Sequence, residues 1–286
     1  MSPLRDTVTR AVVRTKAIFG IERPIFARPA VVPEGGDKPT KDPHPKGLFT
    51  VPELSGRVSA VEQRLYGVEA ISNQQVADAL VLAVEYALGS AVEGDICEFG
   101  SMTGRTGRVL AAAMAAFGQP GSPRTIHLFD SFEGLPASTN EIDRRSAHVT
   151  SGVWGAGTCK GITPQELRVR CEEYLSPPRV KIYEGWFAKT VSEIPSGTRF
   201  SVLHVDCDLY QSTLDCLDPL FAKAMVAPGA ALLFDDWNCN RASSDRGERL
   251  AWAELSKKYA ISHSDWGSYG WAGHRFIVHG YAGAPG

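Results

Sequence analysis

The chain has 286 residues, a formal net charge of −2 at pH 7 and 43% hydrophobic residues. This length supports one large α/β domain with an appendage, or two small domains, and a sizeable core in either case. The near-neutral charge argues against a dedicated nucleic-acid-binding protein, which usually carries a strong excess of basic residues.

The cysteines and the hydropathy pattern indicate in which cellular compartment the protein resides. Six cysteines are scattered along the chain without a CxxC pair, so we interpret them as small buried hydrophobes in a reducing environment. No apolar run approaches the ~18 residues of a membrane span. The N-terminus also lacks the continuous apolar stretch of a secretion signal. We therefore expect a cytoplasmic protein without a membrane span.

The N-terminal part has a composition of its own. Residues 1–22 have the pattern of a basic amphipathic helix, which could dock on a partner subunit or a membrane surface, or be a helical arm of its own domain. Prolines and glycines accumulate over residues 23–52, which is typical of an irregular linker. We predict an arm and linker over residues 1–55 and a second domain over residues 56–286.

Helices and strands alternate in the rest of the chain. Two helices are expected first, at 56–66 and from Ser72 as N-cap to Gly89. Strands are expected at 96–99, 125–129, 180–183, 200–205 and 230–234, with two more strand-like segments at 261–264 and 275–279. Further helices are expected at 108–117, 164–174, 212–223 and 245–258, and a long glycine-rich loop at 133–162. This order predicts an α/β, Rossmann-like fold with a mostly parallel seven-stranded sheet flanked by helices.

A glycine-rich turn follows the first strand. In CEFGSMTGRTG, Gly100, Gly104 and Gly107 let the backbone approach a ligand at a helix N-terminus. The spacing is not the dinucleotide fingerprint, and a tight structural turn would also explain it. Asp130 ends the next strand, where a carboxylate can accept both hydroxyls of a ribose. The two features together favour a nucleoside-containing cofactor.

Acidic residues also end two later strands. Asp206 and Asp208 follow the apolar run at 202–205, and Asp235 and Asp236 follow the run at 231–234. Several stretches, in this order, resemble the macrocin O-methyltransferase family: GDICEFGSMTGRTG, FDSFEGLP, EGWF, HVDCDLYQSTLD and FDDW. The similarity extends from about Tyr66 to His279 and departs from the family pattern in the N-terminal arm and over residues 138–162.

The resemblance implies a class I methyltransferase that uses S-adenosylmethionine and a divalent metal, usually Mg²⁺, to methylate a sugar hydroxyl of a glycosylated metabolite or glycan. It also implies a homodimer. Matched position by position, the methionine end of the cofactor would lie against Glu98, Phe99, Gly100, Ser101, Thr103, Gly104 and Arg105. The ribose would bind Asp130 beside Ser131 and Phe132, and the adenine would lie near Gly185 and Trp186. The metal ligands would be Asp206, Asp235 and Asp236.

The expected sheet geometry supports the metal site independently. In a sheet of order 3-2-1-4-5, the first, fourth and fifth strands are neighbours about 4.8 Å apart, and their carboxyl ends share one crevice. Three carboxylates there would repel one another unless some held protons or a cation bound between them. All-oxygen ligands favour Mg²⁺ over Zn²⁺.

A mechanism follows, with alternatives. Coordination to Mg²⁺ acidifies a sugar hydroxyl, and a carboxylate takes the proton as the oxygen attacks the sulfonium methyl group. Asp206 is our candidate for the base; Asp208 is either a second candidate or a cap of the following helix. His204 either lines the site or is structural. Trp154, Trp186 and Trp237 could stack on a sugar, and for Trp186 a role in the core is equally open. Asn238, Asn240 and Arg241 could contact the acceptor or be a solvated loop.

Two other functions remain open on the sequence. A catechol-type O-methyltransferase would use the same three acids on a phenolic diol. A non-catalytic protein that binds a cofactor or glycan could share the same scaffold.

Overall fold

The computed structural model describes residues 73–119 and 121–284, all of which belong to one compact unit that spans residues 70–286. The predicted arm, the linker, the helix at 56–66 and the Ser72 cap lie outside the described residues. The domain boundary at residues 55 and 56 therefore stays a prediction.

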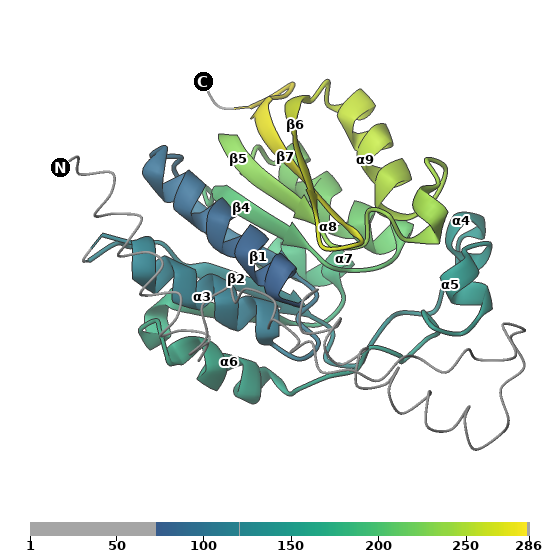
Figure 1. Ribbon diagram of the computed structural model, residues 1–286, viewed down its shortest axis with the longest axis horizontal. Helices are drawn as coiled ribbons and strands as arrows, with labels where there is room; N and C mark the ends of the chain where they lie inside the picture. The colour runs from purple at the N-terminus through teal and green to yellow at the C-terminus, as the bar shows by residue number, and fades with distance from the viewer. Residues whose placement is uncertain (1–72, 120, 285–286) are drawn as a thin grey trace, which may run out of the picture. The chain divides into compact units, whose positions relative to one another are not determined.

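A seven-stranded sheet organises the described part of the chain, with strand order β3-β2-β1-β4-β5-β7-β6 (Figure 1). The bounds are β1 Asp95–Phe99, β2 Ile126–Asp130, β3 Val180–Glu184, β4 Phe200–Val205, β5 Val226–Phe234, β6 Ser262–Tyr269 and β7 Gly273–Gly280. Strands β1 to β5 are parallel, and β7 joins β5 in the antiparallel sense. The predicted order 3-2-1-4-5 and the mostly parallel sheet are confirmed.

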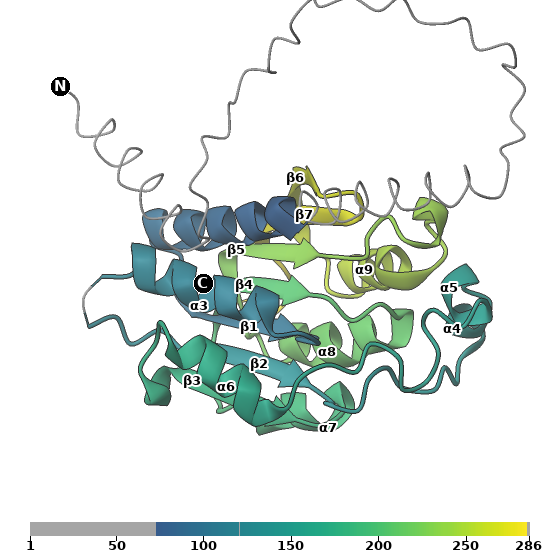
Figure 2. The ribbon, with the colours of Figure 1, turned by 60° about the horizontal axis from the view of Figure 1, so that its bottom comes forward.

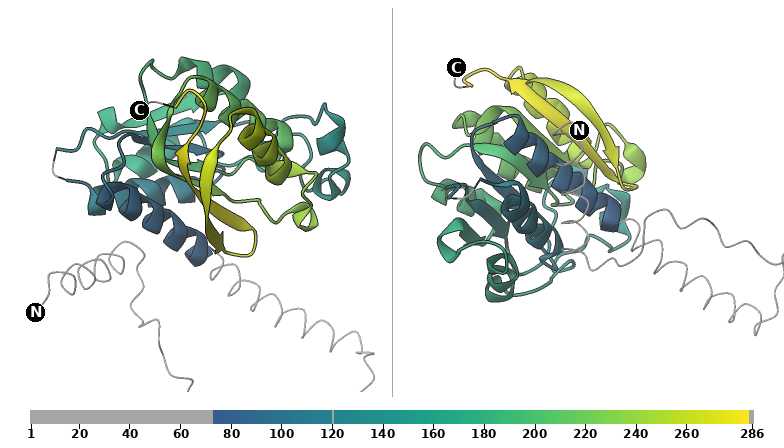
Figure 3. Two further views of the ribbon diagram at one scale, coloured as in Figure 1. Left: turned by 90° about the horizontal axis from the view of Figure 1, so that it is seen from above. Right: turned by 60° about the vertical axis from the view of Figure 1, so that its left-hand side comes forward.

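Burial on both faces explains why the central strands are almost continuously apolar. All six residues of β4 are buried, including Ser201 and His204. The hairpin of β6 and β7 extends the sheet beyond β5 (Figure 3), and much of β6 is exposed. The predicted strands at 261–264 and 275–279 are the beginning of β6 and the end of β7, both longer than expected.

Helices cover both faces (Figure 2). On one face lie a helix at residues 73–89, α3 Arg105–Phe117 and α6 Pro164–Glu172. On the other lie α7 Phe187–Thr190, α8 Tyr210–Ala222 and α9 Gly247–Lys258. Short 3₁₀ turns stand at η1 Pro177–Arg179, η2 Val191–Glu193 and η3 Asn240–Ala242. Helix α6 begins as predicted: Thr163 caps it in a reciprocal pair with Glu166, and Pro164 is its first residue.

The segment at 133–162 is not a simple loop. It contains two single-turn helices, α4 Glu141–Arg144 and α5 Ala147–Thr150. Its ends are held together because Leu135 N–H donates to the Thr158 carbonyl and Gly157 N–H donates to the Leu135 carbonyl, both at 2.8 Å. Among the described residues, no helix is long and apolar enough to cross a membrane.

Candidate active site

The site begins where three neighbouring strands end at the same level. Phe99 of β1 is in register with Val205 of β4, which is in register with Phe234 of β5. The ladder continues one residue further: Asp206 N–H donates to the Phe99 carbonyl and Asp235 N–H donates to the Val205 carbonyl, both at 2.9 Å. The parallel register therefore brings Gly100, Asp206 and Asp235 to one edge of the sheet.

Gly100 is required by this close approach. Its φ is +89°, and a Cβ at this position would lie 1.8 Å from the Asp206 carbonyl oxygen. The chain then turns over the end of β2, where Ser101 N–H and Met102 N–H donate to Asp130 Oδ2 at 2.7 and 3.1 Å. Phe132 N–H donates to Asp130 Oδ1 at 2.7 Å. Asp130 thus holds the glycine-rich turn and the loop after β2 together.

A buried acid–histidine pair links this turn to the acids of β4 and β5. Glu98 and His204 are both fully buried, and Nδ1 of His204 lies 3.1 Å from Glu98 Oε2. Glu98 Oε1 accepts a hydrogen bond from the Ser101 hydroxyl at 2.9 Å. On the other side, His204 Nε2 lies 3.9 Å from Asp235 Oδ1, a charge–charge contact too long for a direct hydrogen bond. Burial lowers the pKa of His204, but the carboxylates of Asp235 and Glu98 outweigh it and raise the pKa to about 10.

The acids themselves are crowded. Burial, followed by repulsion from Asp235 and Asp236, raises the pKa of Asp206 well above its usual range. Burial raises the pKa of Asp236 in the same way, with Asp208 and Asp235 next in importance. Glu248 also belongs to this cluster, although the sequence did not predict it. It is buried, and its Oε2 accepts a hydrogen bond from Asp236 N–H at 3.0 Å. Burial and, second, the charge of Asp236 raise the pKa of Glu248.

Several buried polar atoms of this cluster lack a hydrogen-bond partner among the described residues: His204 Nε2, Asp235 Oδ1, Asp236 Oδ2, Glu248 Oε1 and Tyr269 Oη. Such atoms are costly unless a ligand or solvent satisfies them. Unpartnered carboxylate oxygens are a donor set that suits a hard divalent cation. Within residues 73–119 and 121–284, however, no three His, Cys, Asp or Glu side chains are already spaced to hold a metal ion.

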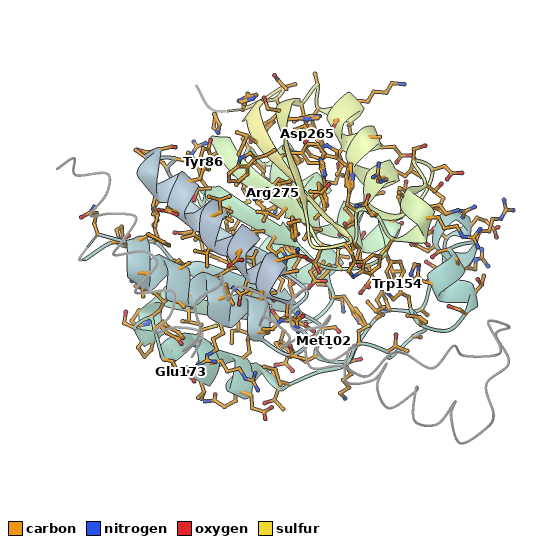
Figure 4. All side chains as sticks on the ribbon, in the orientation of Figure 1. Tyr86, Met102, Trp154, Glu173, Asp265 and Arg275 are labelled. Atoms are coloured by element: carbon orange, nitrogen blue, oxygen red, sulfur yellow. The ribbon has the colours of Figure 1, made fainter. Side chains whose placement is uncertain are left out.

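A pocket of about 540 Å³ opens beside these acids. Its walls come from the turn after β1, the end of β2, the segment at 133–162, the start of α7 and the β4–α8 junction. Figure 4 labels Met102, which lies on the turn after β1 and lines the pocket, and Trp154, which lies in the segment at 133–162 but outside the lining. Five of the predicted site residues line the pocket: Gly100, Asp130, Ser131, Trp186 and Asp206.

The family comparison bears on this site directly. The family model of macrocin O-methyltransferase (TylF) matches residues 54–258, which contain every predicted site residue. The chain belongs to the macrocin O-methyltransferase family. It is an S-adenosylmethionine-dependent O-methyltransferase, as predicted.

Two curated relatives from Streptomyces have similar sequences. The 8-demethyl-8-(2,3-dimethoxy-α-L-rhamnosyl)-tetracenomycin-C 4′-O-methyltransferase of Streptomyces olivaceus is 31% identical over 192 residues, 65% of this chain and 67% of that protein. The demethyldecarbamoylnovobiocin O-methyltransferase of Streptomyces niveus is 31% identical over 159 residues, 54% of this chain. The match spans just over half of that second relative, 56% of its length.

Solved structures support the fold. The O-methyltransferase NovP is 25% identical with a TM-score of 0.58, covering 70% of this chain and 78% of that one. The calicheamicin methyltransferase CalS11 is 20% identical with a TM-score of 0.54, covering 97% of this chain and 93% of that one. The predicted class I methyltransferase fold is thereby confirmed.

The other predicted residues of this methyltransferase lie around the pocket without lining it. Glu98, Phe99 and Ser101 are buried beneath the glycine-rich turn, and Phe99 stacks on Phe129 at 4.7 Å. Thr103 and Arg105 are exposed beside Gly104, which has a φ of +68° and caps α3. The remaining four are Phe132, Gly185, Asp235 and Asp236. The roles of all the predicted site residues, including those that line the pocket, stay predictions.

The helix-capping role that we considered for Asp208 belongs to another residue. Helix α8 has no side-chain cap from its own N-terminus; instead the buried carboxylate of Asp143 accepts from Tyr210 N–H at 2.9 Å and Gln211 N–H at 3.1 Å. Asp208 lines the pocket in a left-handed conformation with a φ of +64°. Burial, followed by Asp206, raises its pKa to about 8. Asp208 therefore gains weight as a functional residue.

Two of the three candidate tryptophans are structural. Trp154 is only 5% exposed and packs with Leu209, Cys239 and Ala272. Trp237 packs between Phe234 and Phe276, under the Arg249 guanidinium. Trp186, 37% exposed, is the one of the three that faces the pocket.

The asparagines after the acid pair are also tied to the protein. Asn238 accepts from Arg249 Nη2 at 2.6 Å. Asn240 is buried, and its Oδ1 accepts from the Ser146 hydroxyl at 2.6 Å. Of the three residues proposed to contact an acceptor, only Arg241 is exposed.

Proposed function

We propose that the protein methylates a sugar hydroxyl of a glycosylated small molecule or glycan, and that Asp206, Asp235 and Asp236 bind Mg²⁺ in support of this reaction. The sugar acceptor is suggested by the relative named for a rhamnosyl-tetracenomycin C, and the other relative is named for demethyldecarbamoylnovobiocin. The metal proposal rests on two buried oxygens, one on Asp235 and one on Asp236, that have no hydrogen-bond partner among the described residues. Burial and the charges of these two residues also raise the pKa of Asp206.

Four residues of the pocket lining belong to the stretches that the family resemblance assigns to the cofactor: Gly100, Asp130, Ser131 and Trp186. S-adenosylmethionine binds against these residues in this proposal. Two backbone N–H groups occupy Asp130 Oδ2 and one binds Oδ1, so Oδ1 keeps a lone pair for one ribose hydroxyl. The aromatic face of Trp186 offers a surface for the adenine.

Of the three proposed metal ligands, Asp206 lines the pocket, and Asp235 and Asp236 do not. When bound, S-adenosylmethionine supplies an electrophilic methyl group, and Mg²⁺ supplies positive charge that lowers the pKa of a nearby hydroxyl. Asp206 and Asp208 both line the pocket, so either carboxylate can take the hydroxyl proton. We assign the proton transfer to Asp206, because its backbone N–H also bonds to the Phe99 carbonyl at the end of β1, where the glycine-rich turn begins.

The decisive experiment measures S-adenosylhomocysteine release with S-adenosylmethionine and a panel of glycosides and catechols, with Mg²⁺ or with EDTA. Glycoside-dependent release that EDTA abolishes supports the proposal. Release only with catechols would move the protein to the alternative function, and no release across the panel would refute catalysis on these acceptors.

Asp235→Ala tests the metal assignment. We expect the variant to lose Mg²⁺-dependent turnover by a factor of about 100 or more, because a ligand is missing. S-adenosylhomocysteine affinity, measured by calorimetry without metal, should stay within threefold, because Glu98, His204 and Ser101 still support the turn. A variant that keeps EDTA-sensitive turnover and loses cofactor affinity would contradict the assignment.

We also propose a cytoplasmic location and a homodimer. The location is supported by the six cysteines, all of which are free thiols in the structure. The dimer rests on the family resemblance. Fractionation of the native host and light scattering of the purified chain test the two proposals separately.

A further inference from the structure

His204 lies between two acids that belong to different parts of the site. Glu98 of β1 is paired with His204 of β4, and His204 with Leu233 of β5, so these three side chains project from the same face of the sheet. Asp235 follows Leu233 by two residues and, by the alternation of side chains along a strand, projects from that face too. The register therefore places the fully buried ring of His204 with Nδ1 3.1 Å from Glu98 Oε2 and Nε2 3.9 Å from Asp235 Oδ1.

The gap between His204 and Asp235 separates a donor from an acceptor. An ionised carboxylate only accepts hydrogen bonds, so Nε2 of His204 is the donor of this pair. Both atoms are buried, and neither has a hydrogen-bond partner among the described residues, which is costly. Asp235 N–H is fixed on the Val205 carbonyl, but rotation of an aspartate carboxylate about χ2 is soft and can shorten the gap. The pair can therefore close by a rotation of the Asp235 side chain, with both backbones in place.

The His204 ring is held from its other side. Glu98 uses both of its carboxylate oxygens: Oε2 faces His204 Nδ1, and Oε1 accepts a hydrogen bond from the Ser101 hydroxyl at 2.9 Å. Helix α3 closes over this carboxylate at Gly107, where a Cβ would lie 3.1 Å from Oε1. The orientation of the ring is therefore set by contacts that begin at the glycine-rich turn, and not by Asp235.

We propose that His204 is a positioning residue for the methyl transfer: Glu98 fixes its ring, and its Nε2 then fixes Oδ1 of Asp235, which leaves Oδ2 of Asp235 to the cation. This inference rests on the proposed function, because it assigns a support to one of the three proposed metal ligands. Partners that hydrogen-bond to metal ligands orient them, and their loss typically weakens metal binding by about 10–100-fold. His204 touches no reacting atom in this scheme, so its effect passes through Asp235.

Two amide substitutions separate the two ring nitrogens of His204. Asparagine places its amide where Nδ1 stands, next to Glu98, and is too short to reach Asp235. Glutamine is one methylene longer and places its amide nitrogen near the position of Nε2. We therefore expect His204→Asn to weaken Mg²⁺ binding by about tenfold or more, and His204→Gln to stay within about threefold of wild type.

Calorimetric titration with Mg²⁺ at saturating S-adenosylhomocysteine gives these affinities, and two further readouts exclude a merely structural role. S-adenosylhomocysteine affinity in EDTA should stay within about threefold of wild type in both variants. In turnover, the asparagine variant should need more Mg²⁺ for its half-maximal rate but keep kcat within about threefold at saturating Mg²⁺. Equal losses of Mg²⁺ affinity in the two variants, no loss in the asparagine variant, or a parallel loss of S-adenosylhomocysteine affinity would overturn the inference.

The wild-type protein provides a measurement that needs no folded variant. In nitrogen NMR of isotopically labelled histidine, Mg²⁺ added to the S-adenosylhomocysteine complex should shift the Nε2 signal of His204. The matched control is His127, another buried histidine, whose ring nitrogens lie 3.0 Å from Tyr183 Oη and 3.0 Å from Asp95 Oδ2. A His204 signal that stays in place while Mg²⁺ binds, or that moves together with that of His127, would overturn the inference.

The binding readouts need no acceptor, so the positioning role of His204 and the glycoside specificity succeed or fail separately. A wild-type protein that binds no Mg²⁺ would refute the metal assignment of the proposed function and the positioning role with it. Failure of the positioning role alone shows only in the variants and in the histidine signals, while wild type still binds Mg²⁺.

Discussion

Asp208→Asn should make the metal-free protein more stable at high pH. Burial and Asp206 raise the pKa of Asp208 to about 8, well above the ordinary value of 3.8. Between these two values the folded chain holds a proton that the unfolded chain has lost, so stability falls as the pH rises through this window. Asparagine removes the ionisation and is among the residues that best tolerate the left-handed conformation found here, with a φ of +64°.

The magnitude follows from the width of that window. A shift from 3.8 to about 8 corresponds to at most about 6 kcal/mol of destabilisation at pH 9. Asp208 is partly open to the pocket, so solvent and relaxation reduce the effect to about 1–3 kcal/mol. For a domain of this size, that is a rise in melting temperature of about 3–10 °C at pH 9, with little change at pH 4, where wild-type Asp208 is already protonated in the folded chain.

The assay is thermal unfolding in EDTA from pH 4 to pH 9, followed by circular dichroism for wild type, Asp208→Asn and Asp208→Ala. Alanine removes the same charge but suits the left-handed conformation less, so its gain at pH 9 should be smaller by about 1 kcal/mol. A difference between the asparagine variant and wild type that does not grow with pH would refute this reasoning. Turnover of the same variant separates the two candidate bases, because with Asp206 as the base it should stay within about tenfold of wild type.

Three further variants test the architecture of the site. Asp143→Ala removes the acceptor of two backbone N–H groups at the start of α8 and should lower the free energy of unfolding by about 1–2 kcal/mol in urea titrations; an unchanged midpoint would refute the capping role. Gly100→Ala places a Cβ 1.8 Å from the Asp206 carbonyl and should abolish S-adenosylhomocysteine binding or folding, whereas normal binding would contradict the close approach. Trp186→Ala should weaken S-adenosylhomocysteine by about tenfold in calorimetry, since stacking on a base contributes about 1–3 kcal/mol; the exposed Trp271, outside the pocket lining, is the control for losing a tryptophan.

The sheet and its strand-end acids could be predicted because they follow from local patterns. Apolar runs fix the parallel strands, and parallel strands bring their carboxyl ends to one edge whatever the loops do. Asp206 and Asp235 therefore share an edge as expected, and Asp130 ends β2 as expected.

The supporting contacts could not be predicted in the same way, because they join residues far apart in the chain. Asp143 caps a helix that begins 67 residues later. His204 and Glu98 are separated by 106 residues and meet only because β1 and β4 are neighbours. Glu248 carries no local signal, since an acid in the first turn of a helix is common for reasons of the helix dipole.

The crowding of acids at this edge argues for a ligand. A buried polar atom without a partner costs about 1–3 kcal/mol, and Asp235, Asp236 and Glu248 each have one. Proteins have net stabilities of only about 5–15 kcal/mol, and apolar replacement of buried charges often stabilises the fold. A chain under pressure for stability alone would lose these acids. A cation bound between Asp235 and Asp236 would offset the repulsion between their carboxylates, and it would do so only in the ligand-bound state. That is the state in which a methyltransferase needs its site to be held most firmly.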